Sequence, residues 1–344
     1  MYHDPALYAE MRERVFARSW QLAGDASRLK TPGRVVPFTL LPGCLDEPLV
    51  WTRDDDSTVH CLSNVCTHRG TIVVEGEGHA SMLRCRYHGR RFHLDGRFHS
   101  MPEFDGVENF PTEADNLPRV QMAQWGPLLF ASIDPAFTFE DWMKPVKERV
   151  GFLPIDQYVF DPANSRDYHI DANWALYCDN YLEEFHIPFI HKGSLGGKLD
   201  YEAYRTELFD YCNLQHGVAP AGEPAFELPE GHPDERARMG AFYFWMFPNL
   251  MLNFYPWGLS VNVVYPLGPT RSRVSFLRYA LPGAAAPTDG AGGDLHRVEM
   301  EDEEIVESAQ RGVRSRLYDR GRYSPRRETG THHFHTLLAR FLAE

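Results

Sequence analysis

The chain has 344 residues, of which 43% are hydrophobic and 13% aromatic, enough apolar side chains for one large domain or two ordinary ones. Its formal net charge of -13, from 35 basic and 48 acidic residues, argues against nucleic-acid binding, which needs a clustered basic surface. No apolar run reaches the roughly 18 residues of a membrane helix, and the first twenty residues lack the pattern of a signal peptide. We therefore expect a cytoplasmic protein with no membrane contact, whose six cysteines stay reduced.

The predicted elements change in character along the chain. Helical spacing of apolar residues predicts a helix over residues 5–20. From about residue 33 to 135, short apolar runs separated by Pro, Gly and Asp predict antiparallel strands. Residues 139–153 and 172–191 read as helices, the second one breaking near Pro188. Strands are expected again over 203–281, followed by two closing helices over 296–317 and 331–344.

Two Cys-His pairs lie in loops of the first strand-rich region. They are Cys66-x-His68, within CTHRG, and Cys85-x-x-His88, within CRYHG. Two thiolates and two imidazoles suit tetrahedral zinc or an iron–sulfur cluster. Because each pair mixes one Cys with one His, we favour a [2Fe-2S] cluster in which two cysteines hold one iron and two histidines hold the other. The spacing resembles the Rieske signature, although many Rieske proteins have Trp where this chain has Arg90.

A second constellation follows a hundred residues later, in NYLEEFHIPFIH. Glu183 and His186 are three residues apart, so a helix would present them on one face, and a break at Pro188 would turn His191 back towards His186. Two histidines and one carboxylate form the facial triad of non-haem Fe(II) sites, which keeps positions open for oxygen.

Together the two motifs resemble the α subunit of Rieske non-haem iron oxygenases, and the resemblance covers essentially the whole chain. It implies that His186 and His191 bind iron together with a carboxylate from the long C-terminal helix. Asp302 aligns best, and the competing nearby acids are Glu299, Glu301, Glu303, Glu304 and Glu307.

The resemblance also implies a role for two acids before His186. Glu183 matches the carboxylate that joins the iron site to a cluster histidine, here His68 or His88, of a neighbouring subunit in a ring-shaped homotrimer. Asp179 is a further candidate for orienting the iron site, with a purely structural role equally open.

The implied fold is α+β. A small antiparallel-β Rieske domain over residues 34–135 would be inserted in a helix-grip catalytic domain made of residues 1–33 and 136–344. In this fold an antiparallel sheet wraps around a long C-terminal helix.

The implied function is the terminal oxygenase of a multicomponent system that uses O2. Because the sequence has no nicotinamide or flavin motif, we expect NAD(P)H to act through a separate reductase, with or without a ferredoxin. DNYLEEFH and the C-terminal segments resemble the branch that oxidises choline, glycine betaine and carnitine, which predicts a small quaternary ammonium substrate. Aromatic side chains in the strands could form a cation-binding wall, or could simply be core. They are Tyr243, Trp245, Phe247, Tyr255 and Trp257.

Three alternatives remain open at this level. One is an aromatic-ring cis-dihydroxylating dioxygenase with the same two metal centres. Another is a pure electron carrier, which would leave the second motif unexplained. The last is a zinc-stabilised protein that binds a hydrophobic ligand without catalysis.

Overall fold

The computed structural model describes residues 1–191, 198–285 and 294–343, and the chain divides into two compact units. The small unit is Trp20–Pro135, and the large unit combines Met1–Ser19 with Ala136–Glu344. The expected boundary at residue 34 differs from the observed start at Trp20. The reason is that β1 (Gln21–Asp25) pairs antiparallel with β10 (Leu128–Ser132), so residues 20–33 belong to the small unit.

The small unit consists of three antiparallel sheets. The first has the strand order β1-β10-β9, the second β4-β3-β2-β5 and the third β6-β7-β8. The remaining strands are β2 (Arg34–Leu40), β3 (Glu47–Arg53), β4 (Val59–Ser63), β5 (Gly78–His79), β6 (Leu83–Arg84), β7 (Arg91–Phe92), β8 (Phe98–Ser100) and β9 (Gln121–Trp125). Short helical turns lie at η2 (Ala26–Leu29) and η3 (Glu113–Asp115).

Two apolar cores support these sheets. One core includes Cys66 and Cys85 together with Val50, Leu62 and Phe92, so both cysteines of the predicted cluster belong to it. The other core packs around Trp51 and contains Cys61, a small buried thiol outside the motif. The strands thus hold the two Cys-His loops against one shared core.

The large unit is built on a seven-stranded antiparallel sheet with the order β11-β17-β16-β15-β14-β13-β12. Its strands are β11 (Val159–Ile170), β12 (Thr206–Leu208), β13 (Cys212–Val218), β14 (Met239–Met246), β15 (Leu250–Tyr255), β16 (Gly258–Gly268) and β17 (Arg271–Ala280). Most side chains of β13 to β16 are buried, including residues that point to opposite faces of the sheet. Such strands have protein packed on both faces of the sheet, so a site can lie between the sheet and the helices that cover it.

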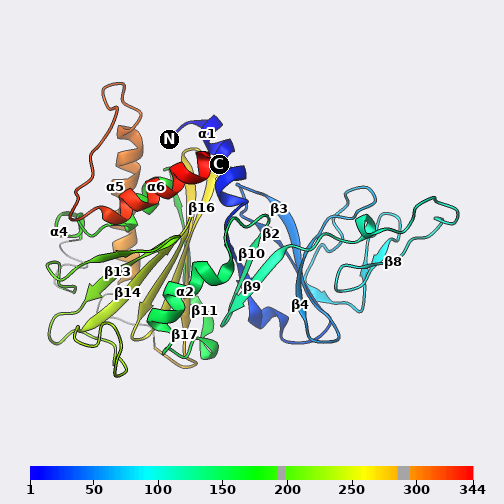
Figure 1. The fold of residues 1–344 in the computed structure, drawn as a ribbon, viewed down its shortest axis with the longest axis horizontal. Helices are drawn as coiled ribbons and strands as arrows, with labels where there is room; N and C mark the ends of the chain where they lie inside the picture. Colours follow the sequence, from blue (N-terminus) through cyan, green and yellow to red (C-terminus); the bar gives the residue numbers. More distant parts are fainter. Residues whose placement is uncertain (192–197, 286–293, 344) are drawn as a thin grey trace. The chain divides into compact units, whose positions relative to one another are not determined.

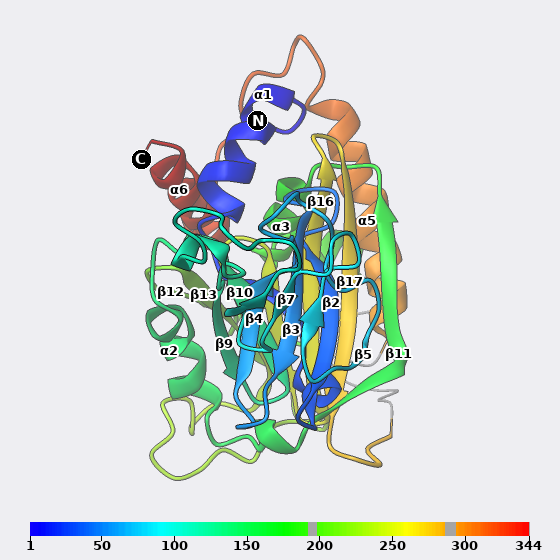
Figure 2. The same ribbon diagram turned by 90° about the vertical axis from the view of Figure 1, so that its right-hand side faces the viewer.

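Helices complete the large unit. They are α1 (Pro5–Met11) with η1 (Arg12–Phe16), α2 (Phe139–Val150) with η4 (Ile155–Gln157), α3 (Trp174–Tyr181), α4 (Ile187–Ile190), α5 (Leu295–Gly312) and α6 (Thr329–Ala343). Helix α3 contacts β16, β17, α5 and α6, so it is the central piece between the sheet and the closing helices. The long helix α5, orange in Figures 1 and 2, runs in roughly the same direction as the strands. This arrangement of an antiparallel sheet and a long C-terminal helix is the predicted α+β fold.

The predicted helix over 172–191 is wrong in one respect. Helix α3 ends at Tyr181, and Pro188 lies in the first turn of the separate helix α4, where a missing N–H costs nothing. The Tyr181 carbonyl accepts a hydrogen bond from the Gln215 side-chain amide at 2.9 Å. A side chain from β13 therefore satisfies the carbonyl at the end of α3, and the chain turns before reaching His186.

No helix in the described part of the chain is both long and apolar enough to cross a membrane.

Candidate metal centres and active-site pocket

The two Cys-His loops of the small unit have matching backbone geometry. The Gly70 N–H donates to the Cys66 carbonyl at 2.9 Å, and the Gly89 N–H donates to the Cys85 carbonyl at 3.0 Å. Both glycines have left-handed φ values, +73° and +75°, a conformation that costs glycine little. The CTHRG and CRYHG sequences thus produce two equivalent tight turns, each presenting one Cys and one His.

The four side chains are suited to a [2Fe-2S] cluster. Cys66 and Cys85 are buried and free of disulfides, and the rings of His68 and His88 lie 4.8 Å apart. Nδ1 of His88 is buried and has no hydrogen-bond partner among the described residues, which leaves it free to bind a metal. Burial, the neighbouring His88 and nearby arginines lower the pKa of His68, which favours the neutral imidazole that metal binding requires.

Arg90, which replaces the usual Trp of the Rieske motif, is buried beside the second loop. Its guanidinium carbon lies 4.9 to 5.7 Å from the ring centroids of Phe92, Phe98 and Phe110. It also donates to the Asp115 carboxylate at 2.6 Å and to the Asp115 carbonyl at 3.1 Å. Arg90 therefore places a planar cation among three aromatic rings and connects the second loop to η3. The Asp115 carbonyl in η3 also accepts a hydrogen bond from the Thr67 hydroxyl of the first loop at 2.8 Å, so η3 contacts both loops.

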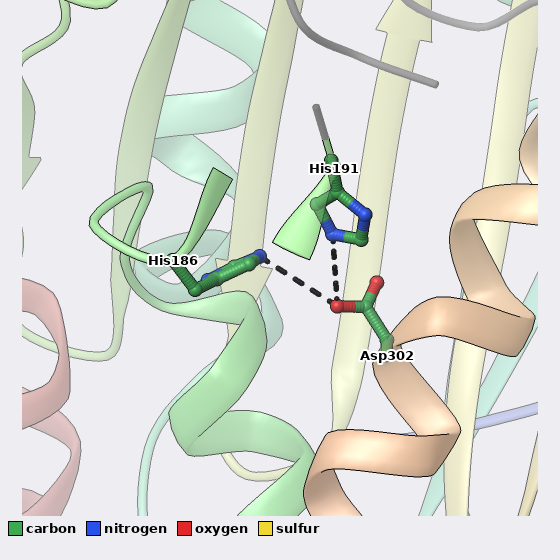
Figure 3. A group of neighbouring side chains, drawn as sticks. All are labelled: His186, His191 and Asp302. Carbon is green, nitrogen blue, oxygen red and sulfur yellow. Dashed lines mark hydrogen bonds and ion pairs between the residues drawn. The ribbon is translucent and has the colours of Figure 1, made fainter. Parts of the chain in front are cut away.

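In the large unit, His186, His191 and Asp302 converge (Figure 3). One Asp302 carboxylate oxygen lies 3.0 Å from His191 Nε2 and 3.6 Å from His186 Nε2. One ligand atom from each residue lies within 4.8 Å of the others, a group that could hold a metal ion. The turn after α3 carries His186, the end of α4 carries His191, and α5 carries Asp302. Two imidazoles and one carboxylate are the donor set of a facial triad.

Outer contacts orient these three residues. Glu183 lies 2.8 Å from His186 Nδ1 and accepts from the His186 backbone N–H at 3.1 Å. Glu301 lies 2.8 Å from His191 Nδ1. The Asn180 amide donates to Asp302 at 2.7 Å. Both histidines are thus held by Nδ1 with Nε2 directed at Asp302, the usual second-shell arrangement of metal-binding histidines.

The competing acids have other positions. Glu301 faces the far side of the His191 ring, and Glu299 is buried with Tyr177, whose hydroxyl donates to it at 2.6 Å. Glu307 accepts from the Asp171 backbone N–H at 3.0 Å. Glu303 and Glu304 are absent from the group of ligand atoms around the histidines.

A cavity of about 120 Å³ adjoins the three residues, between α3, α5 and the sheet. Tyrosines dominate its aromatic lining, and they are Tyr177, Tyr181, Tyr204, Tyr243 and Tyr255. Of the five predicted wall residues, the cavity lining therefore contains Tyr243 and Tyr255. Their rings pack edge to face, with centroids 5.8 Å apart.

The other three predicted wall residues lie elsewhere. Trp245 packs on Phe334 of α6, with ring centroids 5.2 Å apart, and Phe247 packs on Phe341 of α6 at 4.7 Å. These two residues lie further along the sheet, where α6 covers its face. Trp257 stacks on the ring of Tyr255 at 5.1 Å and is absent from the cavity lining.

Glu184 was missed at the level of sequence, and Glu299 was considered there only as a competing iron ligand. Glu184 and Glu299 are 5% and 2% exposed, and Glu184 Oε2 and Glu299 Oε1 are buried without a hydrogen-bond partner among the described residues. Burial raises the pKa of Glu184 to about 9 and that of Glu299 well above its usual value. Within a run of acids and next to Glu183, neither residue carries a pattern that separates it from a solvated acid.

Asp179 does not point at the three converging residues. Its carboxylate accepts from the Tyr2 hydroxyl at 2.7 Å and lies 2.8 Å from His335 Nε2, which joins α3 to the N-terminus and α6. Asp179 and Glu183 both line a second cavity of about 760 Å³. These contacts favour the structural reading of Asp179.

A further group, Glu207, His216 and Asp234, also brings three potential ligand atoms together. Arg149 forms ion pairs with Glu207 and Asp234, both at 2.6 Å, and Arg205 pairs with Asp234 at 2.6 Å. Because two guanidinium groups already neutralise the carboxylates, this group is an ion-pair network rather than a cation site.

Comparisons with known families agree with both units. Residues 160–344 match the model of the ring-hydroxylating α subunit catalytic domain, and residues 19–111 match that of the Rieske [2Fe-2S] domain. The first match covers more than half of the chain. The protein therefore belongs to the Rieske ring-hydroxylating oxygenase α subunits, and it is an oxidoreductase with a Rieske cluster and a mononuclear iron, acting as the terminal component of its system.

Individual relatives narrow this class. The chain is 33% identical to chloroplastic choline monooxygenase of Arabidopsis thaliana, over 98% of this chain and 80% of the relative. It is 29% identical to the oxygenase subunit of carnitine monooxygenase from Escherichia coli K12, over 98% of this chain and 91% of the relative. A solved quaternary ammonium Rieske monooxygenase, described for carnitine oxidation and inter-subunit electron transfer, superposes with a TM-score of 0.76 at 25% identity, covering 99% of this chain and 93% of that one. Naphthalene 1,2-dioxygenase from Rhodococcus shares the fold, with a TM-score of 0.75 at 22% identity, covering 99% of this chain and 93% of that one.

Proposed function

We propose that His186, His191 and Asp302 bind the mononuclear iron. The observation that carries this proposal is the convergence of their ligand atoms within 4.8 Å, next to a buried cavity. When bound, the iron supplies the activation of O2, and the protein supplies ligand geometry and access. Glu183, Glu301 and Asn180 would keep the three ligands oriented through the contacts described above.

We propose that Cys66 and Cys85 hold one iron of the cluster and that His68 and His88 hold the other. Support comes from the two equivalent loops, the burial of both thiols and the unpartnered Nδ1 of His88. The ring of Tyr87 stacks on His88 with centroids 3.8 Å apart, and Tyr87 is 53% exposed. A cluster histidine beside an exposed ring is accessible to another protein surface, as electron transfer requires.

We further propose that Glu183 links the iron site to the cluster of a neighbouring subunit in a homotrimer. One Glu183 oxygen contacts His186 Nδ1, and the residue also lines the second cavity, so a partner could reach it. The exposed rings of Phe185 and Phe189, 43% and 65% exposed, flank this site and would be covered by a subunit contact. Reducing equivalents would come from NAD(P)H through a separate reductase, with or without a ferredoxin.

The substrate that we propose is a small quaternary ammonium compound, which the enzyme hydroxylates or demethylates. Several tyrosines line a small cavity beside the proposed iron ligands, and aromatic faces attract alkylammonium cations. The choline and carnitine monooxygenases similar to this chain act on such compounds by name. Ring dihydroxylation has no comparable support, because naphthalene dioxygenase shares only the fold. The large unit matches an oxygenase catalytic domain and the small unit a Rieske [2Fe-2S] domain, so neither zinc binding without catalysis nor pure electron transport accounts for the chain.

The test combines metal analysis with product identification. Purified protein, Fe(II), O2 and a reductase would be supplied with choline, glycine betaine, carnitine and a panel of small aromatics, and products would be identified by mass. His186→Ala is expected to keep the cluster absorption and to lose mononuclear iron and turnover. His169→Ala, in the exposed part of β11, is the matched control and should keep both. A cis-diol from an aromatic, or turnover by His186→Ala, would contradict the proposal.

A further inference from the structure

Glu184 is a buried acid whose side chain forms no ion pair with the residues that the structure describes. It lines the cavity and is 5% exposed, and its Oε2 is buried without a hydrogen-bond partner among the described residues. A buried carboxylate is unfavourable unless a positive charge or several donors lie beside it. Without a ligand, burial therefore favours the protonated acid, and a cation placed in the cavity would offset that cost and favour the carboxylate.

The neighbouring donors are already used within the protein. The Tyr181 hydroxyl donates to Asn253 Oδ1 at 2.6 Å, and the Tyr204 hydroxyl donates to Gln215 Oε1. Both tyrosines line the same cavity as Glu184. The rings are therefore held in place while their O–H groups donate to acceptors other than Glu184.

The described positive charge that acts on Glu184 has other partners. Arg327 acts on Glu184 through its charge, but its guanidinium donates to the Tyr201 carbonyl at 2.9 Å and lies 4.0 Å from the Tyr201 ring centroid. It also forms an ion pair with Glu202 at 3.7 Å. Arg327 does not line the cavity.

The charges of the described cavity lining also favour a cationic ligand. Its described residues include four acids and neither Lys nor Arg, and the acids are Glu183, Glu184, Glu299 and Asp302. Two of these acids are assigned above to the iron site, and Glu299 already accepts from Tyr177. Glu184 is the acid that remains, and the described lining has no Lys or Arg that could pair with a carboxylate of the substrate.

We propose that Glu184 is the counterion of the substrate's ammonium group and that it selects choline-like cations over betaine-like zwitterions. This inference rests on the proposed function and deepens it. Tyrosine faces bind an alkylammonium group without regard to the rest of the molecule, whereas a carboxylate counterion favours a ligand with net positive charge. A neutral molecule of the same shape gains nothing from Glu184.

The experiment measures binding to the holoprotein by calorimetry. The ligands are choline, glycine betaine and 3,3-dimethylbutanol, which is the neutral isostere of choline. Glu184→Gln keeps the shape and removes the charge, and we expect it to weaken choline binding by about 10- to 100-fold while leaving the neutral alcohol unchanged. In turnover the loss should appear as a raised KM with kcat largely retained. Glu304→Gln removes an exposed acid from α5 and is the matched control.

The outcomes separate the two proposals. Wild-type protein that binds choline at least tenfold more tightly than both other ligands, with the preference lost in Glu184→Gln, supports the counterion. Choline affinity that is unchanged in a correctly folded Glu184→Gln protein overturns it and leaves the proposed function intact. If the Glu184→Gln variant loses its cluster absorption, the test uses the wild-type affinities for choline and the neutral alcohol instead. Equal wild-type affinity for these two ligands overturns the counterion proposal. Wild-type protein that neither binds nor oxidises any ammonium compound overturns the proposed function itself.

Discussion

Replacing Arg90 by Met should lower the free energy of unfolding of the small unit by about 3 kcal/mol. The change removes a charge-assisted hydrogen bond, which contributes about 1.5–3 kcal/mol, and cation–π contacts, which contribute about 1 kcal/mol. Met keeps most of the apolar stem, so a cavity contributes little. The lost bonds are those to the carboxylate and the carbonyl of Asp115, at 2.6 and 3.1 Å. Asp115 would keep its bonds from the Thr112 backbone N–H and hydroxyl, at 2.7 and 3.1 Å. The buried Nε of Arg90, which lacks a partner, is removed as well, and this offsets part of the loss.

The assay is urea unfolding followed by bleaching of the cluster absorption, which reports on the small unit. Arg91→Met changes an exposed neighbour in β7 and is the control, with an expected change of less than about 0.5 kcal/mol. If Arg90→Met and Arg91→Met unfold at the same urea concentration, the ion pair and ring contacts of Arg90 do not stabilise this unit, and the reasoning is refuted.

The remaining predictions concern the large unit. Glu183→Gln should keep both metal centres and slow oxidation of the reduced cluster by about 10- to 100-fold, because it alters the group that contacts His186 Nδ1. Stopped-flow spectroscopy measures this rate, and an unchanged rate would remove Glu183 from the electron path. Asn180→Ala should weaken iron binding by about 10- to 100-fold, because Asp302 loses a donor at 2.7 Å, and titration with Fe(II) measures this effect. Arg149→Ala should lower the free energy of unfolding by about 3 kcal/mol, because it takes one guanidinium from the fully buried Asp234. A metal-binding phenotype for that variant, with stability unchanged, would contradict the ion-pair reading.

The motifs that could be predicted from the sequence are those whose geometry is local. A Cys, a His and a Gly within five residues are enough to form each loop of the cluster, because one backbone hydrogen bond and one left-handed glycine close the turn. Likewise, His186 and His191 are close in the chain, so their convergence needs only a turn between them. Asp302 could be selected from five neighbouring acids only through the family resemblance, since helical spacing alone leaves several of them open.

Interactions between distant segments decided the rest. Helix α3 ends at Tyr181 because Gln215, on a strand 34 residues later, caps its carbonyl. The partners of Asp179 are Tyr2 and His335, which lie 177 and 156 residues away along the chain, so its contacts could not be read from local spacing.

The residues that line the cavity were also decided by contacts between distant segments. Alternation along β14 puts Tyr243 and Trp245 on one face of the sheet, and sequence cannot distinguish the two. The cavity covers that face at Tyr243 and α6 covers it at Trp245. Similarly, the adjacent acids differ in their surroundings, because Glu183 contacts a histidine nitrogen while Glu184 Oε2 is buried without a partner among the described residues. Chemistry that depends on ligand type and short spacing is readable from the chain, whereas burial and partners are set by whichever segments pack around each side chain.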